Sequence, residues 1–193
     1  MTDQELIEGI KRHDRIAIRQ LVDQYQKKVI KTAYYFLGNM EDAEDLSQEI
    51  FLEIMESIKK FRKEASFTTW VYRITVNKSL NKIRKDKRRA IISSLESVFH
   101  SPQGKGANHL AIPSPCCFPF EEQEKRALLY QAIGRLPENQ RIAFVLQKFE
   151  EQSYKEIAEV MSMSLSSIES LIHRAKMNLQ KRLLPHFSEY SKK

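Results

Sequence analysis

The sequence is poor in the residues and segments that mark several classes of protein. It has only 5 glycines and 6 prolines among 193 residues, and because both residues interrupt helices, their scarcity favours a helical protein. No apolar run approaches the roughly 20 residues that span a membrane. The polar segment 1–14 lacks the continuous apolar region of a secretory signal. We therefore expect a cytoplasmic, mostly helical protein.

Side chains able to do chemistry are also few and dispersed. The cysteines, Cys116 and Cys117, are adjacent, which suits neither the spacing of a zinc site nor a disulfide framework. The 5 histidines are scattered, and none is spaced with Cys, Asp or Glu in a catalytic pattern. We expect no catalytic residue, no metal, no cofactor and no small-molecule substrate, and we interpret the two thiols as inert.

Positive charge is in excess, and the helix-breaking residues are concentrated in one segment. The 32 Lys and Arg outnumber the 25 Asp and Glu, as in proteins that bind a polyanion. The segment His100–Phe120 holds four of the six prolines. We expect an all-α chain with helical domains at 1–90 and 121–185, a flexible linker at 91–120 and a tail at 186–193. A coil of about 30 residues spans roughly 30 Å, close to one turn of B-DNA, so the domains could contact separate sites on one duplex.

A basic helix is expected to begin at Ser66, whose hydroxyl suits a helix cap. One stripe of this helix, termed the core stripe, is apolar and should be buried: Tyr72, Val76, Leu80 and Ile83. Another side begins with Trp70 and continues as the basic face: Arg73, Asn77, Asn81, Arg84 and Arg88. Asparagine can bind base edges, Arg and Lys neutralise phosphates, and an aromatic ring can stack on an unpaired base. This pattern favours nucleic acid. A solvated face and an anionic membrane surface are the alternatives.

The preceding helix, within Gly38–Phe61, has the opposite charge. Asn39 is the expected cap, and 41–56 contains seven acids and no base. One side of it forms an acidic stripe: Asp42, Asp45, Glu49, Glu53 and Glu56. Phosphate would be repelled by this stripe, so it implies a protein partner with a basic groove. A solvated helix surface is the alternative.

The C-terminal part has the pattern of a helix-turn-helix. Ser153 and Glu156 form a capping box, Ser164 is the expected cap of the second helix, and Ser162 stands in the turn where glycine is frequent. The second helix would enter a major groove. Its outward side, termed the recognition face, is placed to reach bases or phosphates: Ser166, Ser167, Glu169, Ser170, His173, Arg174 and Lys176. A generic helical hairpin is the alternative.

Four motifs follow one another in a recognisable order: LGNMEDAEDLSQEIFLE, SFTTWVYRITVNKSLNKIRK, LPENQR and SYKEIAEVMSMSLSSIESLIHRAK. Together they resemble a bacterial RNA polymerase sigma factor of the extracytoplasmic-function (ECF) subgroup of the sigma-70 family, over residues 5–184 except the linker. The resemblance implies a region-two helical bundle at 1–90 and a region-four helix-turn-helix at 121–185. It also implies a transcription initiation factor that binds core polymerase, recognises the −10 and −35 promoter elements and aids promoter melting.

The resemblance assigns roles to individual residues. Five would dock on the clamp helices of the largest polymerase subunit: Asp42, Asp45, Gln48, Glu49 and Phe51. Ten would bind the −10 element and hold a flipped base: Arg62, Lys63, Ser66, Trp70, Arg73, Asn77, Lys78, Asn81, Arg84 and Arg88. The recognition face would read the −35 element, although Glu169 and Leu171 stand where basic residues are common. The implied partners are core polymerase, through its clamp helices and flap region, promoter DNA and an anti-sigma protein.

Two other functions are compatible with parts of the sequence. A helix-turn-helix regulator would bind duplex DNA tightly without polymerase. A nuclease would act through the basic domain, but the carboxylates gather on one helix stripe without a convergent histidine. Binding to core polymerase separates the sigma-factor hypothesis from both.

Overall fold

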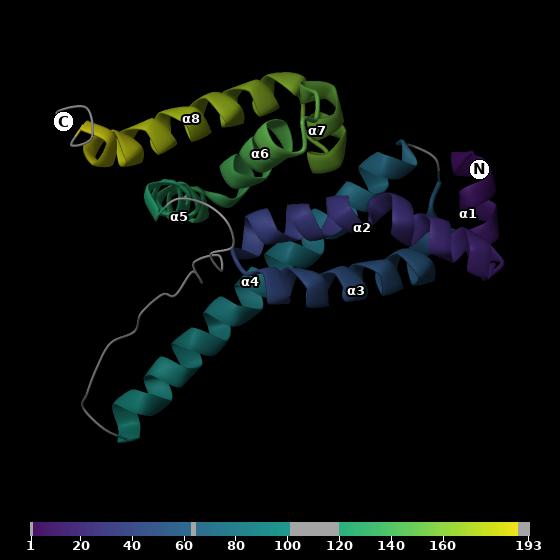
Figure 1. Ribbon diagram of the computed structural model, residues 1–193, viewed down its shortest axis with the longest axis horizontal. Helices are drawn as coiled ribbons and strands as arrows, with labels where there is room; N and C mark the ends of the chain where they lie inside the picture. Colours follow the sequence, from purple (N-terminus) through teal and green to yellow (C-terminus); the bar gives the residue numbers. More distant parts are fainter. Residues whose placement is uncertain (1, 63–64, 101–119, 189–193) are drawn as a thin grey trace.

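The computed structural model describes residues 2–62, 65–100 and 120–188, and within these residues all regular structure is helical (Figure 1). The first part of the chain forms α1 (Asp3–Lys11), α2 (Arg15–Leu37), α3 (Met40–Ser57), the short 3-10 helix η1 (Ile58–Lys60) and α4 (Phe67–His100). The second part forms α5 (Phe120–Gly134), α6 (Glu138–Phe149), α7 (Tyr154–Met161) and α8 (Leu165–Ser188). No helix among the described residues is long and apolar enough to cross a membrane.

The N-terminal domain is a bundle of α1 to α4, with each helix start fixed by a side-chain cap. Thr2 and Glu5 form a capping box at α1, and Asn39 Oδ1 accepts from the Glu41 amide at the start of α3, as predicted. The core contains fully buried side chains from every helix of the bundle: Leu6, Ile10, Leu21, Tyr25, Val29, Ile50, Ile54, Phe67 and Val71. Each fully buried aliphatic side chain contributes roughly 1.5–3 kcal/mol, so this set holds the bundle together.

The C-terminal domain consists of α5 to α8, and α7 with α8 forms the predicted helix-turn-helix. The capping box of Ser153 and Glu156 is present, and the Ser167 amide donates to Ser164 Oγ at 3.3 Å. Both predicted caps are therefore confirmed. Ser162 ends α7 in the left-handed region, with φ 53° and ψ 46°. Its backbone conformation explains why glycine is frequent at this position of the motif.

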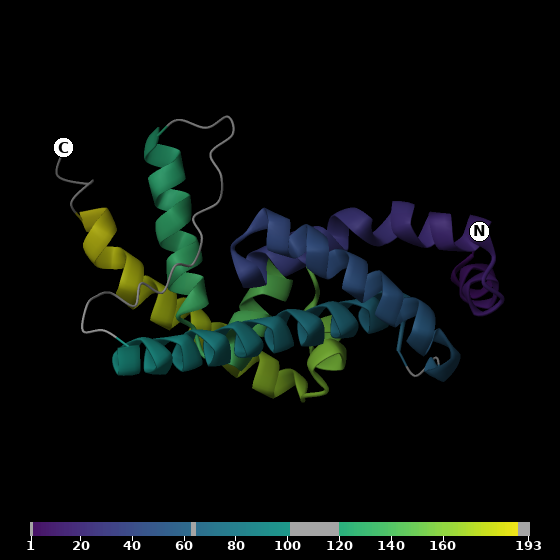
Figure 2. The ribbon, with the colours of Figure 1, turned by 90° about the horizontal axis from the view of Figure 1, so that it is seen from below.

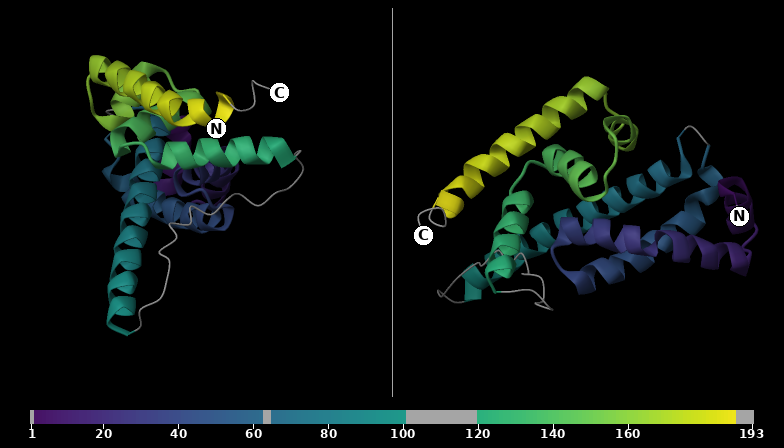
Figure 3. Two further views of the ribbon diagram at one scale, coloured as in Figure 1. Left: turned by 90° about the vertical axis from the view of Figure 1, so that its left-hand side faces the viewer. Right: turned by 45° about the horizontal axis from the view of Figure 1, so that its top comes forward.

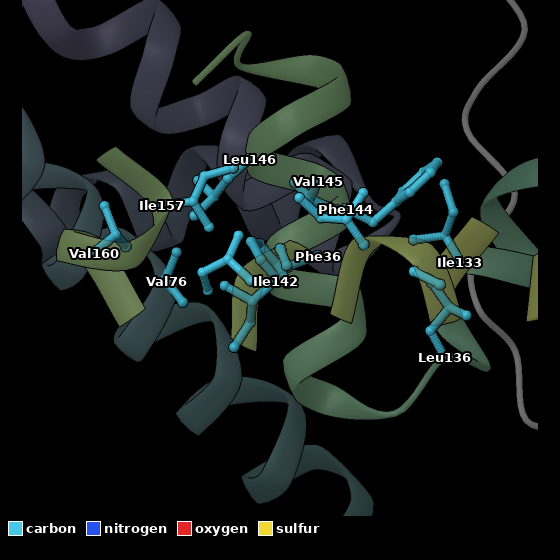
Figure 4. Close-up of a cluster of buried hydrophobic side chains, with 14 of the residues drawn as sticks. Phe36, Val76, Ile133, Leu136, Ile142, Phe144, Val145, Leu146, Ile157 and Val160 are labelled. Carbon is cyan, nitrogen blue, oxygen red and sulfur yellow. The ribbon is translucent and has the colours of Figure 1, made fainter. Parts of the chain in front are cut away.

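The two domains pack directly on each other through a continuous apolar core. Phe36 of α2 and Tyr72, Val76 and Leu80 of α4 join the buried residues of α5 to α8 in one cluster. Figure 4 shows Phe36 and Val76 among a group of side chains from the C-terminal domain: Ile142, Leu146, Ile157 and Val160. Tyr72, Val76 and Leu80 of the core stripe are buried as predicted, and Ile83 is partly buried, but the stripe faces the other domain. Phe67 and Val71 supply the core of its own domain.

α4 is longer than the predicted domain. It continues past residue 90 to His100, and its last turns project away from the two packed domains (Figures 1 and 3). The first ten residues of the predicted linker, 91–100, are therefore helical. Residues 101–119 of that linker, with Cys116 and Cys117, lie outside the described residues, and Phe120 begins α5. Seen from below, α4 runs along the body between α2 and α3 on one side and α7 on the other (Figure 2).

Candidate nucleic-acid and protein interfaces

One side of α3 carries acidic and polar side chains into solvent. Asp45, Gln48 and Glu49 are exposed, as expected for a docking surface. Phe51, which the sequence motifs assigned to the docking surface, is only 8% exposed, and its side chain belongs to the core of the N-terminal domain. The neighbouring Leu52 is 55% exposed instead. We define the docking face as Asp45, Gln48, Glu49 and Leu52, whose helical spacing of three, one and three places them together.

The acidic stripe is partly neutralised inside the protein. Asp42 Oδ1 lies 2.8 Å from Lys82 Nζ, and Glu53 Oε2 lies 3.3 Å from Lys78 Nζ. The hydrogen bond to Asp42 raises the pKa of the Lys82 ammonium group. Asp42 and Lys78 were expected to bind polymerase and DNA, yet here each links α3 to α4. Part of the opposite charge of these two helices thus joins α3 to α4 within the domain.

An aromatic group marks the start of α4. Trp70 is half-buried, with ring centroids 5.2 Å from Phe61 and 5.7 Å from Phe67. Ser66 Oγ accepts from the Thr69 amide at 3.0 Å, which confirms the predicted cap. Arg62 is exposed, and Lys63 lies outside the described residues. Trp70 is therefore held by neighbouring rings while part of its surface faces solvent.

The basic face of α4 is divided between solvent and the C-terminal domain. Asn77, Asn81 and Arg88 are exposed. Arg73 donates from Nε and Nη2 to the backbone carbonyl of Glu159 in α7, with an Nε distance of 3.0 Å. Arg84 forms an ion pair with Glu138 at the start of α6, and its Nε lies 3.3 Å from Oε2. Two of the cations assigned to the −10 element are therefore bound by the other domain.

A third polar contact between the domains is buried. Glu150 follows α6, and its side chain is 3% exposed, 3.7 Å from Lys31 Nζ of α2. The hydroxyl of Tyr72 in α4 donates to Glu150 Oε2 at 3.0 Å. Burial raises the pKa of the Glu150 carboxyl, and Lys31 and Tyr72 oppose that shift. Sequence reasoning missed Glu150, because nothing in a run of two glutamates shows which one becomes buried.

Aromatic and cationic contacts complete the interface between the domains. Tyr35 of α2 stacks on Phe149 of α6, with 3.9 Å between ring centroids, and on Tyr130 of α5 at 6.0 Å. The Arg141 guanidinium lies 5.7 Å from the ring centre of Phe36 and is 6% exposed. Burial lowers the pKa of Arg141. Charged groups thus enter what is otherwise an apolar interface.

The recognition face of α8 is open to solvent. All seven of its residues are exposed except Ser167, which is half-buried. Ser166, Ser170 and Arg174 line a shallow surface groove with Met163 and Leu171. Leu171 packs partly against the core, in line with the inward position that its spacing predicts. Glu169 is exposed and is available to a base edge.

Comparisons with known proteins agree with this geometry. Residues 21–89 match the model of Sigma-70 region 2, and residues 126–179 match that of Sigma-70, region 4. The RNA polymerase sigma-H factor of Pseudomonas aeruginosa is 31% identical over 189 residues, covering 97% of this chain and 96% of the relative. This chain belongs to the sigma-70 family of RNA polymerase sigma factors. The ECF RNA polymerase sigma-E factor of Escherichia coli K12 is 30% identical over 185 residues, covering 96% of each chain, which places this sigma factor in the ECF subgroup.

Two solved structures share the fold of this sigma factor at low sequence identity. CnrH, solved in complex with the cytosolic domain of CnrY, has a TM-score of 0.65 at 21% identity and covers 94% of this chain and 96% of its own. The sigma factor RpoE of Bartonella quintana, solved with the anti-sigma factor NepR, has a TM-score of 0.62 at 20% identity. The match covers 86% of this chain and 95% of the RpoE chain. Both confirm the all-helical fold.

Proposed function

We propose that separate surfaces of this sigma factor carry out polymerase binding, −10 recognition and −35 recognition. As a sigma factor, the protein binds core RNA polymerase and directs it to promoters. The observation that supports a division of labour is the segregation of charge: the docking face carries exposed carboxylates, whereas the basic face and the recognition face both carry exposed cations. Like charge would repel DNA from the first surface, and opposite charge would attract it to the other two.

The docking face binds a basic surface of polymerase in this proposal. Asp45 and Glu49 have no ion-pair partner among the described residues, in contrast to Asp42 and Glu53. Leu52 adds an exposed apolar side chain next to them. An apolar contact surrounded by complementary charge is a common arrangement in protein interfaces. These residues therefore suit the clamp helices that the sequence motifs indicated.

The start of α4 and its basic face bind the −10 element. Trp70 offers a ring held by Phe61 and Phe67, on which an unpaired base can stack. Asn77 and Asn81 can hydrogen-bond base edges, and Arg88 can neutralise phosphate. Flipping a base from the stack costs a few kcal/mol, and these contacts would offset that cost. Ser66 acts mainly as a helix cap in this arrangement.

The recognition face of α8 reads the −35 element as duplex DNA. Its serines and Arg174 lie in the leading turns of the second helix of a helix-turn-helix, where side chains reach base edges in the major groove. Glu169 accepts hydrogen bonds only, so it would favour the amino group of a cytosine. We expect the −35 preference of this protein to differ from that of relatives with a basic residue there.

We further propose a cytoplasmic protein that performs no chemistry of its own and is held inactive by an anti-sigma protein. RpoE, which shares the fold, was solved with the anti-sigma factor NepR. Co-purification with a protein encoded beside its gene, and loss of transcription when that protein is added, would support this partner. Unchanged transcription in its presence would count against it.

The deciding experiment is transcription by bacterial core polymerase on a genomic library, with and without this protein, followed by mapping of new start sites. We expect new starts that share sequences at −10 and −35. The absence of new starts, together with no binding to core polymerase, would instead indicate a regulator that binds duplex DNA alone. Tight sequence-specific binding by the free protein would distinguish that regulator.

A further inference from the structure

A groove of about 660 Å³ lies between α3 and α4, which run side by side in the N-terminal domain (Figure 1). Its described lining residues come from these two helices alone. Leu46 of α3 is buried and Ile74 of α4 is half-buried, so these two side chains form an apolar floor. We term this surface the α3–α4 groove.

The two walls of the α3–α4 groove carry opposite charge. Glu49 and Glu53 lie on the α3 wall. The α4 wall carries four cations at a helical spacing of four, three and four, which places them on one stripe: Lys78, Lys82, Lys85 and Arg89. Asp86 of α4 also lines the groove. A ligand in the groove would therefore meet carboxylates on one wall and mainly cations on the other.

Internal ion pairs use only part of this charge. Lys78 and Lys82 are paired with carboxylates of α3. Lys85 and Arg89 are exposed and have no ion-pair partner within residues 2–62, 65–100 and 120–188. Glu49 is exposed and unpaired in the same part of the structure. The ion pairs thus hold the two walls together, while one carboxylate on the first wall and two cations on the second remain available to a partner.

The arrangement of charge suits a protein rather than DNA. A phosphate backbone in the groove would lie against the Glu49 and Asp86 carboxylates, which would repel it. Lys85 also lies about 100° around α4 from Arg84, the preceding residue, since a helix has 3.6 residues per turn. The two unpaired cations of the groove are therefore on a different side of α4 from the arginines of the basic face.

We propose that polymerase docking extends from α3 across this groove to α4, where Lys85 and Arg89 bind carboxylates of polymerase. Glu49 supports the extension, because it belongs to the docking face and also lines the groove, so the two surfaces are continuous. The occupant is a segment of polymerase with cationic side chains toward α3 and acidic ones toward α4, since protein interfaces match opposite charges. The inference rests on the proposed function, because it takes the docking face as the polymerase-binding surface.

The proposal gives α4 contacts with both macromolecules. The basic face would bind the −10 strand, and the side nearest α3 would bind polymerase through Lys85 and Arg89. The ion pairs between α3 and α4 fix the two walls before polymerase binds, so little conformational freedom is lost on binding. A change from cation to carboxylate on α4 should therefore weaken polymerase binding, although the docking face itself is acidic.

Lys85 and Lys87 provide a matched pair of variants. Both side chains are exposed on α4, but only Lys85 lines the groove. Two positions along a helix correspond to about 200° of rotation, so Lys87 lies on nearly the opposite side of α4. Lys85→Glu and Lys87→Glu change the charge of the same helix by the same amount. Only the first places a carboxylate where the proposal puts a carboxylate of polymerase. Lys85→Arg keeps the positive charge and is the conservative variant.

The first measurement is affinity for core polymerase without DNA, by titration of fluorescently labelled protein at fixed salt. We expect Lys85→Glu and Arg89→Glu each to bind at least about fivefold more weakly than Lys87→Glu, because a like-charge pair replaces an opposite-charge pair. Lys85→Arg should bind as the wild-type protein does. If overall charge alone attracted a basic partner, the added carboxylate would instead strengthen binding in both lysine-to-glutamate variants.

A second measurement separates a polymerase contact from a DNA contact. With core polymerase at saturating concentration, the affinity of each variant complex for a promoter found by start-site mapping is measured at several salt concentrations. A cation that neutralises a phosphate contributes roughly 0.9 to the slope of log affinity against log salt. We expect Lys85→Glu to keep the wild-type slope, and Arg88→Ala, which removes a cation of the basic face, to reduce it.

Specific results would overturn the proposal. One is equal core affinity of Lys85→Glu and Lys87→Glu, and another is a reduced salt slope in Lys85→Glu with unchanged core affinity, which would make the groove a DNA site. The triple change Asp45→Ala, Gln48→Ala and Glu49→Ala tests the docking face by itself. If the triple variant binds core normally, the docking face is wrong, and its extension is then wrong as well. Weak binding by the triple variant with normal binding by Lys85→Glu rejects the groove contact alone. Lys85→Ala repeats the test if Lys85→Glu loses its helical circular dichroism.

Discussion

At the scale of the residue, Ser162 shows how one side chain limits stability. A non-glycine residue in the left-handed region costs about 1–2 kcal/mol. Because Ser162 has φ 53°, Ser162→Gly removes this cost. Glycine also has more freedom in the unfolded chain, which opposes folding, so we expect a net rise in the free energy of unfolding of roughly 0.5–1 kcal/mol. Urea denaturation measures this change. Ser166→Gly, inside α8, is the control and should lower stability by a similar amount, and a destabilised Ser162→Gly would contradict the prediction.

Trp70 is the residue for which packing and function must be separated. We expect Trp70→Ala to reduce promoter opening by about 5- to 150-fold with little change in polymerase binding, since stacking on one base contributes about 1–3 kcal/mol. Permanganate reactivity of the melted −10 strand and affinity for core polymerase measure the two effects. Trp70→Phe keeps a ring beside Phe61 and Phe67 and should retain most of the opening activity. If it is as defective as Trp70→Ala, a stacking platform is the wrong explanation.

At the scale of the element, α3 and α4 each use their sides for different purposes. α3 buries Leu46, Ile50 and Ile54, pairs part of its acidic stripe with α4, and leaves the docking face open. α4 packs on its own domain through Phe67 and Val71 and on the other domain through the core stripe. A helix presents several faces at once because its residues repeat every 3.6 positions. The role of each charged side chain on such a helix therefore has to be determined residue by residue.

The docking face can be tested against the rest of the same helix. We expect the combined change Asp45→Ala, Gln48→Ala and Glu49→Ala to weaken binding to core polymerase at least about tenfold with the fold intact, because it removes two unpaired carboxylates from the contact. The control is Asp42→Ala with Glu53→Ala, whose carboxylates bind Lys82 and Lys78. Titration of labelled core polymerase compares the two. An equal loss of affinity in both variants, or no loss in either, would refute the prediction that the docking face binds polymerase.

At the scale of the whole molecule, the main feature is that two domains with separate sequence motifs share one core. The interface between the domains contains apolar side chains, an aromatic stack and a buried carboxylate. Burial of the Glu150 carboxyl makes this packing sensitive to pH. Lys31 and Lys28 of α2 and Tyr72 of α4 are the charged or titratable groups that face it.

The direction in which pH changes the packing of the domains follows from the raised pKa of Glu150. The pKa of Glu150 is raised in the packed state, so that state binds the proton more tightly than the separated one. The contribution of this proton to packing is full below the ordinary pKa of 4.5 and is lost as pH rises through the raised value. With one dye on an exposed residue of each domain, we expect energy transfer between the domains to increase as pH falls from about 7 toward about 5. Glu150→Gln should abolish this slope, and an unchanged slope would exclude Glu150 as its origin.

The sequence by itself determined most of the helices, their caps and the charge pattern along each helix. Ser66, Asn39, Ser153 and Ser164 were identifiable as caps because capping depends on neighbours within one turn. The order of the motifs indicated the family, and spacing alone placed Asp45 and Glu49 on one stripe. These features are local, since hydrogen bonds near a helix end and helical periodicity involve residues a few positions apart.

Only the tertiary structure decided what covers each face. Periodicity showed that Tyr72, Val76 and Leu80 share a buried stripe, but not that the C-terminal domain buries them. It likewise placed Phe51 near the acidic residues without showing that its ring enters the core. Arg73 and Arg84 lie on the basic face by sequence, yet their partners are about 50 to 90 residues away along the chain. Contacts at such separation depend on the packing of whole helices, which a local pattern does not encode.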